Sequence, residues 1–288
     1  MAQLSRWNVS RWNVLLVWSL LGLIVRPASS QSLSTRGSTL RAVRIDKSGL
    51  GFEINFSGQR FVQQAPLTIE TVDSNGQAQW VKGGYSSWKA NGKTLRAEGE
   101  LLSSHGTRFL FRDTYQSDAT GFQLERRVEV ASPHPQDAGF SSRFGVPWEK
   151  PLKVSAGDAI MPGVWYRDNK SIPPKAFPVA LDEEVMMLRE DRLGLPLVGF
   201  RDRESGISLT LQRVGGQPTT FAGDAGRERQ IDRRMQTGAL GFLHDEKLEQ
   251  AFSFPGSEDE RSSIAPDSLP GQRYLPRSHP VEAGFVQD

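Results

Sequence analysis

The densest group of aromatic and polar side chains in the sequence is one five-residue run. It consists of Trp165, Tyr166, Arg167, Asp168 and Asn169. An indole ring offers a flat apolar face, and neighbouring guanidinium, carboxylate and amide groups can form paired hydrogen bonds with hydroxyls. Recognition of a sugar ring requires this combination. The alternative is a rim loop in which Trp165 packs into the core while Arg167 and Asp168 pair with each other.

A second group of charged side chains consists of Glu190, Asp191 and Arg192. Paired carboxylates act as acid and base, or as acid and nucleophile, in glycoside hydrolysis. Adjacent residues of a strand point to opposite faces, however, so Glu190 and Asp191 are poorly placed to act as such a pair. The interleaved arginines, with Arg201 and Asp202 further along, favour structural ion pairs. We therefore treat the three residues as candidate ligand-binding residues and assign no catalytic residue.

Other reactive residue types are sparse. Histidines stand singly at positions 105, 134, 244 and 279, without the spacing that places two imidazoles on one metal, and the chain has no cysteine. Each histidine is expected on the surface or in a loop. There is no Gly-x-Ser-x-Gly nucleophile motif and no phosphate-binding glycine motif. The sequence thus predicts neither a metal site nor a cofactor site.

Strands are the elements that must position these side chains. From about residue 41 onward, apolar residues alternate with polar ones. Alternation with a period of two is typical of strands that bury one face. The alternating residues are Phe52, Ile54 and Phe56; Phe109, Phe111 and Tyr115; Phe122, Leu124, Val128 and Val130; and Ile207, Leu209 and Leu211. We expect Trp80, Trp88 and Trp148 to be core or hairpin aromatics.

Turn sequences separate these predicted strands. Asn91-Gly92 predicts a tight hairpin, and Asp73-Ser74-Asn75-Gly76 predicts a second turn. Helical periodicity is nearly confined to residues 181–193, where one short helix or a strand fits. Many strands with few helices predict an all-β fold, a large antiparallel β-sandwich with little helix.

Residues 1–30 have the organisation of an export signal. Arg6 and Arg11 precede an apolar run over residues 14–25, which small residues follow. The run is shorter than the roughly twenty apolar residues that span a bilayer, so we expect cleavage near Gln31. The mature chain is then secreted or periplasmic, with no membrane association after cleavage.

Charge and cysteine content narrow the classes of partner. Removal of the leader with its three arginines takes the formal net charge from +2 to −1. Nucleic-acid binding needs a surplus of Lys and Arg to neutralise phosphates, so no nucleic-acid partner is expected. An exported chain without cysteine is more typical of a bacterial periplasm than of an animal secretory pathway.

Composition changes towards the end of the chain. Residues 31–256 are predicted to form the β-sandwich domain. After a charged run, prolines recur, so we expect residues 257–288 to form an extended Pro-rich linker or the truncated start of a following domain. Apolar residues such as Tyr274, Leu275 and Phe285 would then have no burial partner, and the tail would be mobile.

Four short strings carry a resemblance to a known family. They are Trp-Tyr-Arg-Asp-Asn at 165–169, Leu-Arg-Glu-Asp-Arg at 188–192, Leu-Pro-Leu-Val at 195–198 and Phe-Pro-Gly-Ser-Glu at 254–258. In these strings the chain resembles the N-terminal region of secreted six-hairpin glycosidases, in which a galactose-mutarotase-like supersandwich precedes an α/α toroid. The resemblance implies a supersandwich, a carbohydrate ligand and a missing C-terminal catalytic barrel that carries the acid and base. It places the 165–169 loop at the rim of that barrel's active site.

Three functions remain open on this basis. The first is an exported carbohydrate-associated β-sandwich, the non-catalytic N-terminal part of a glycoside hydrolase-like protein, which binds an oligosaccharide or polysaccharide or supports a catalytic barrel. The second is a small mutarotase-like or epimerase-like sugar enzyme that uses Glu190 or Asp191 as base and a histidine as acid. The third is a structural or interaction β-sandwich protein. The sequence favours the first, and so leans against enzymatic activity of this chain alone.

Overall fold

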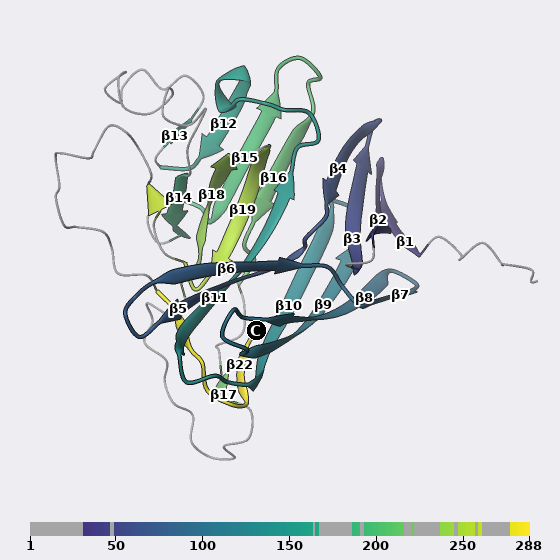
Figure 1. Cartoon of the computed structure of the whole chain (residues 1–288). Coiled ribbons are helices and arrows are strands. Elements are labelled where there is room, and N and C mark those ends of the chain that lie inside the picture. Colours follow the sequence, from purple (N-terminus) through teal and green to yellow (C-terminus); the bar gives the residue numbers. More distant parts are fainter. Residues whose placement is uncertain are drawn as a thin grey trace, which may run out of the picture.

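The expected all-β fold is confirmed by the computed structural model. It describes residues 31–46, 49–163, 165–166, 186–190, 193–215, 220–221, 237–244, 247–256, 259–260 and 277–288. Within these residues the chain forms four antiparallel sheets, joined by turns and one short 3₁₀ helix, η1 (Val154–Ala156) (Figure 1). No helix among them is long and apolar enough to cross a membrane.

Two sheets make up most of the sandwich. The large sheet has the strand order β20-β14-β18-β19-β11-β5-β6, and β21 also pairs with β11. Its strands are β5 (Leu67–Asp73), β6 (Ala78–Gly83), β11 (Asp137–Pro147), β14 (Met186–Arg189), β18 (Ala239–His244), β19 (Leu248–Phe254), β20 (Asp259–Glu260) and β21 (His279–Pro280). The opposing sheet has the order β17-β22-β10-β9-β8-β7. Its strands are β7 (Ser87–Asn91), β8 (Thr94–Leu102), β9 (Arg108–Ser117), β10 (Phe122–Ser132), β17 (Thr220–Phe221) and β22 (Phe285–Gln287).

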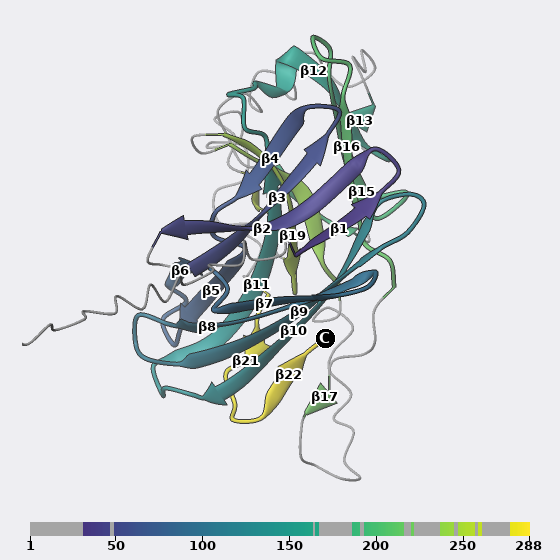
Figure 2. The ribbon, with the colours of Figure 1, turned by 90° about the vertical axis from the view of Figure 1, so that its right-hand side faces the viewer.

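Two smaller sheets complete the described fold. The N-terminal sheet contains β1 (Ser32–Thr35), β2 (Ser38–Asp46), β3 (Gly49–Phe56) and β4 (Gln59–Gln63) in chain order. The side sheet has the order β13-β12-β15-β16 and contains β12 (Gly157–Met161), β13 (Trp165–Tyr166), β15 (Leu197–Asp202) and β16 (Ser208–Gln212). Figures 1 and 2 show the side sheet at the end of the molecule opposite to β22.

Both predicted turns are confirmed. Asn91 pairs with Thr94 at the end of the β7–β8 hairpin, and Gly92 has φ 61°. Glycine adopts this left-handed conformation without the steric cost that a side chain brings. In the β5–β6 turn, the Asp73 carboxylate accepts hydrogen bonds from the backbone N–H groups of Asn75 and Gln77, each at 2.8 Å. For residues 181–193 the sequence allowed either a short helix or a strand. The described part of this segment contains the strand β14.

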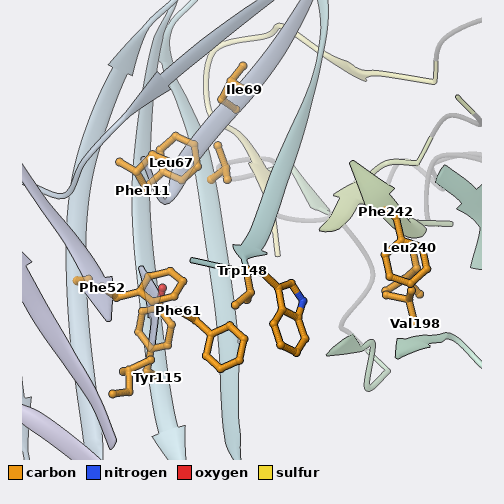
Figure 3. Packing of buried hydrophobic residues seen from close by; sticks show 14 of the residues in the cluster. Phe52, Phe61, Leu67, Ile69, Phe111, Tyr115, Trp148, Val198, Leu240 and Phe242 are labelled. Carbon is orange, nitrogen blue, oxygen red and sulfur yellow. The ribbon is translucent and has the colours of Figure 1, made fainter. Parts of the chain in front are cut away.

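The core lies on the inner face of the large sheet. Phe140 of β11 contacts Phe109 of the opposing sheet, with ring centroids 5.1 Å apart. Towards the other end of the large sheet, Phe200 of the side sheet contacts Trp148 and Phe242 at 5.2 and 6.3 Å. Figure 3 shows Trp148 between Phe61 and Tyr115 on one side and Val198, Leu240 and Phe242 on the other. Phe144 of β11 also stacks on Phe52 of the N-terminal sheet, with ring centroids 5.7 Å apart, so the large sheet buries one face against three other sheets.

A charged pair lies inside this core. Asp113 and Arg126 face each other across β9 and β10, and Arg126 Nη2 donates to Asp113 Oδ2 at 2.6 Å. The Tyr85 hydroxyl also donates to Asp113 and lies 2.7 Å from the Tyr115 hydroxyl. Burial, followed by the negative charge of Asp113, raises the pKa of Tyr85 well above its usual value. The hydroxyl of Tyr85 therefore stays neutral and can act as a donor.

Residues 277–288 form part of the sandwich. β22 pairs with β10, as Figure 2 shows, and β21 pairs with β11. Phe285 and His279 are both fully buried, and their rings contact Phe140. The expectation that Phe285 has no burial partner is therefore wrong, and so is the surface or loop position expected for His279. The physical reason is that Phe285 fills the space beside Phe140 between the two main sheets. Tyr274 and Leu275 lie outside the described residues.

Candidate functional site

The outer face of the large sheet carries a compact group of polar and aromatic side chains. Strand register places them in two neighbouring rows across β6, β5, β11 and β19. The first row is Trp80, Glu70 and Ser141, and the second is Thr68, Arg143 and Ser253. Paired residues of antiparallel strands lie on the same face, and successive residues alternate between faces. We call these six residues the Trp80 face; it is opposite to the core.

Arg143 joins the two rows of the Trp80 face. Its guanidinium carbon lies 3.9 Å from the centroid of the Trp80 ring. Its Nε donates to the Ser253 hydroxyl at 3.0 Å. A guanidinium stacked on an indole and fixed by a hydrogen bond has little freedom to rearrange. The arrangement therefore presents a rigid planar cation beside a half-buried aromatic ring.

The hydroxyl groups of this face belong to well-packed residues. Thr68, Ser141 and Ser253 have exposed fractions of 7%, 3% and 5%. Further along, the same face carries an apolar cluster on β14, β18 and β19 that is separate from the main core, and its members are Met187, Ala239, Leu243 and Ala251. Trp80, Glu70 and Arg143 are the partly exposed members of this face, and an aromatic ring beside a guanidinium and a carboxylate matches the alternating apolar and polar faces of a sugar.

The structure describes only part of the 165–169 run. Trp165 and Tyr166 form β13, which pairs with Met161 and Ile160 of β12. The side chains of Trp165 and Tyr166 lie outside the described structure, and so do the residues Arg167, Asp168, Asn169, Asp191 and Arg192. Gly194 N donates to Pro162 O at 2.7 Å, which joins the turn after β12 to the segment that follows Glu190.

Glu190 is engaged in structural contacts. Its carboxylate accepts hydrogen bonds from Arg213 Nη1 and, at 2.8 Å, from the backbone N–H of Gly238. The Arg213 guanidinium in turn lies 4.7 Å from the centroid of the Phe254 ring. Glu190 thus forms a structural ion pair, but its partner is Arg213 and not one of the interleaved arginines on which the prediction was based. These contacts connect β14, β16 and the start of β18, so Glu190 supports the sheets that lie around it.

A cluster formed by two loops was missed by the sequence reasoning. Asp137, at the start of β11, accepts hydrogen bonds from the Ser103 and Thr107 hydroxyls at 2.5 and 2.6 Å, and His105 Nδ1 lies 2.8 Å from Asp137 Oδ1. The His134 ring lies nearly parallel to that of His105, with centroids 6.1 Å apart. The cluster combines the β8–β9 and β10–β11 loops, which are about thirty residues apart. No local spacing indicates it, because strand pairing alone brings the loops together.

The electrostatics of Asp137 follow from these contacts. Burial opposes ionisation of the carboxyl, but hydrogen bonds from Ser103, Thr107 and His105 outweigh burial and lower its pKa. Asp137 is therefore a stable anion that orients the donors around it. Among the described residues, no group of three or more His, Cys, Asp or Glu side chains could hold a metal ion.

Comparisons with known proteins add no family to this description. No protein-family model, curated protein or solved structure matches the chain. The functional argument therefore depends on the fold, on the Trp80 face and on the loop cluster.

Proposed function

We propose that this protein is an exported β-sandwich that binds an oligosaccharide or polysaccharide through the Trp80 face. The observation that carries the proposal is the stacked pair of Trp80 and Arg143, with Ser253 holding the guanidinium. Stacking of a sugar's C–H face on an indole, together with hydrogen bonds from a fixed guanidinium to vicinal hydroxyls, gives both affinity and orientation.

The charge and rigidity of the surface support this choice of ligand. Glu70 contributes a negative charge to this face, and Arg143 and Lys82, which pairs with Thr68, contribute two positive charges, so the surface carries both acceptors and donors for sugar hydroxyls. Strand residues hold their side chains more firmly than loop residues, so less side-chain entropy is lost on binding. The 165–169 run, with its candidate residues Trp165 to Asn169, remains a second proposed contact region.

The resemblance to six-hairpin glycosidases gives this binding a biological setting. In the proposal the chain is the non-catalytic N-terminal part of a glycoside hydrolase-like protein and holds the glycan for a catalytic barrel. The contacts of Glu190 support a non-catalytic part, because its carboxylate is occupied by Arg213 and the Gly238 N–H. We assign no catalytic residue to the chain.

Substitution of Trp80 tests the proposal. Glycan arrays on the purified protein identify a ligand, and calorimetry then compares variants. Trp80→Ala is expected to weaken binding by about tenfold or more, and Trp80→Phe by less, since a phenyl ring keeps part of the stacking surface. Arg112→Ala, on the exposed face of the opposing sheet, is the matched control and should bind normally.

Two outcomes would contradict the proposal. The first is unchanged binding by a Trp80→Ala variant with a normal far-ultraviolet circular dichroism spectrum. The second is the absence of a bound glycan on arrays that cover neutral plant, bacterial and storage polysaccharides. Loss of binding in Trp165→Ala with full binding in Trp80→Ala would move the site to the 165–169 run.

A further inference from the structure

Strand β16 is an edge of the side sheet, because in the described part of the chain it pairs with β15 alone (Figure 1). Two backbone bonds continue the β15–β16 ladder beyond its ends. Asp202 N donates to Ile207 O at 3.0 Å, and Arg213 N donates to Pro196 O at 2.9 Å. Hydrogen-bonded pairs recur at every second residue of an antiparallel ladder. The odd-numbered residues of β16 therefore bond to β15, and the even-numbered residues direct their backbone groups away from the sheet.

Three residues present these outward backbone groups, namely Ser208, Thr210 and Gln212, and all three are exposed. Within the described ranges, no hydrogen bond joins their outward N–H and C=O groups to another part of the chain. A row of unpaired backbone donors and acceptors at a sheet edge is a template on which a further strand can pair.

The sequence of β16 does not oppose such pairing. Edge strands are commonly protected by a charged side chain or a proline. The edge strands β4, β6 and β7 each carry a basic residue, which is Arg60, Lys82 or Lys89. β16 reads Ser-Leu-Thr-Leu-Gln and contains no charge, proline or glycine. It is therefore the edge of this group that accepts a partner strand at the lowest electrostatic cost.

An exposed apolar pair lies at one end of the same edge. Leu195 and Val214 have exposed fractions of 56% and 74%, and the bond from Arg213 N to Pro196 O holds their neighbours side by side. Leu102 is the other large apolar side chain that is exposed among the described residues. Exposed apolar surface that continues an unpaired strand edge favours a protein partner.

β16 is complementary to a second copy of itself. In an antiparallel pair about a twofold axis at Thr210, the two Thr210 residues oppose each other and Ser208 opposes Gln212. Between these pairs, Leu209 opposes Leu211, and both leucines pack against the core. Every outward backbone group of the strand then has a partner, and polar side chains meet polar ones while leucine meets leucine.

We infer that two copies of this protein form a dimer by antiparallel pairing of β16 with β16, which joins the two side sheets into one continuous sheet. The inference goes beyond the proposed function, because it uses neither the Trp80 face nor a glycan. Failure of either proposal therefore leaves the other untouched.

Sedimentation equilibrium on the full-length protein tests the dimer. We expect a reversible monomer–dimer equilibrium between about 1 and 200 μM, since pairing of one short strand makes a small interface. Thr210→Lys places two like charges opposite each other at the twofold axis and should weaken dimerisation by about tenfold or more. Ser87→Lys makes the matched change on the edge strand β7, where Ser87 is exposed, and should dimerise normally.

Cross-linking tests the register. The chain has no cysteine, so Thr210→Cys introduces a single thiol, which the axis places opposite its copy. Opposed hydrogen-bonded residues have Cα atoms about 5.5 Å apart, which is within the range that a disulfide spans. Mild oxidation should therefore link Thr210→Cys into a covalent dimer. Ser208→Cys is the matched control and should remain largely unlinked, because Ser208 opposes Gln212.

Three outcomes would overturn the inference. The first is a protein that is monomeric throughout the concentration range. The second is a Thr210→Lys variant that dimerises as tightly as the unaltered protein, because the dimer would then use another surface. The third is a monomer whose Thr210 amide becomes protected from hydrogen exchange when a synthetic peptide of alternating valine and threonine is added, which would assign the edge to a strand of a different protein.

Discussion

Asp113 and Arg126 show how single residues define this core. The Asp113 side chain is fully buried and that of Arg126 is 10% exposed, and the guanidinium also donates to the carbonyl groups of Pro66 and Arg143 at 2.8 Å each. Each charge is satisfied by the other and by fixed dipoles. A buried pair of this kind is costly to break, because removal of one partner leaves the other charged in an apolar surrounding.

We expect Asp113→Leu to lower the free energy of unfolding by about 3–5 kcal/mol, because Arg126 loses its counter-ion inside the core. Urea titration followed by tryptophan fluorescence measures the change. Glu100→Leu is the matched control, since the Glu100–Arg108 pair at 2.6 Å is exposed and screened by solvent, and its loss should have a much smaller effect. Equal effects of the two substitutions would contradict the role given to Asp113.

Asp137 gives the protein a defined pH dependence. Its pKa in the folded state lies below the usual 3.8, so ionised Asp137 stabilises the fold at higher pH. This contribution is lost as the pH falls through the lowered pKa. The difference in unfolding free energy between the unaltered protein and Asp137→Asn should therefore be constant near neutrality and shrink below about pH 4. A difference that stays constant down to pH 2 would contradict the assignment.

At the scale of elements, the alternating sequence pattern is a reliable guide, because a strand with one buried face needs an apolar residue at every second position. In β8 and β9 burial alternates along nearly the whole strand. Asp113 and Arg126 also stand at inward positions of this pattern. The sequence alone therefore indicates that these two charged residues are buried. Trp80 carries no such signal. Its place on the outer face follows from register, which depends on strands distant in the sequence.

The C-terminal strand shows the limit of composition as a guide. Proline and charge made residues 257–288 look like a linker, yet β22 places Phe285 and Val286 in the core. Gln287 anchors the strand through hydrogen bonds to Phe254 O at 2.7 Å and to the buried ring of His279 at 2.8 Å. A strand of three residues has too short a pattern to be recognised, and its partners β10 and β17 are distant in the chain.

We expect Phe285→Ala to destabilise the protein by about 3–5 kcal/mol, because it leaves a cavity beside Phe140 in a region that cannot easily collapse. Thermal and urea unfolding measure the loss. Leu102→Ala removes an apolar side chain that is 56% exposed and serves as the control, with an expected effect within about 0.5 kcal/mol. If the Phe285 variant is as stable as the control, β22 does not contribute to the cooperative core.

At the scale of the whole molecule, the large sheet has two different faces. Its inner face is buried against the opposing sheet, the side sheet and the N-terminal sheet, which gives a chain without disulfides its stability. Its outer face carries the Trp80 face and the separate apolar cluster. The fold class followed from alternation, but the candidate site did not, because its six residues come from four strands that only the completed sheet brings together.

The most direct test of the central claim is a map of amide chemical shifts during titration with a glycan that binds on the array. If the Trp80 face is the binding surface, we expect the largest changes on β5, β6, β11 and β19, centred on Trp80, Glu70, Ser141 and Arg143. Changes confined to other strands or loops, or no changes at saturating glycan, would contradict the account.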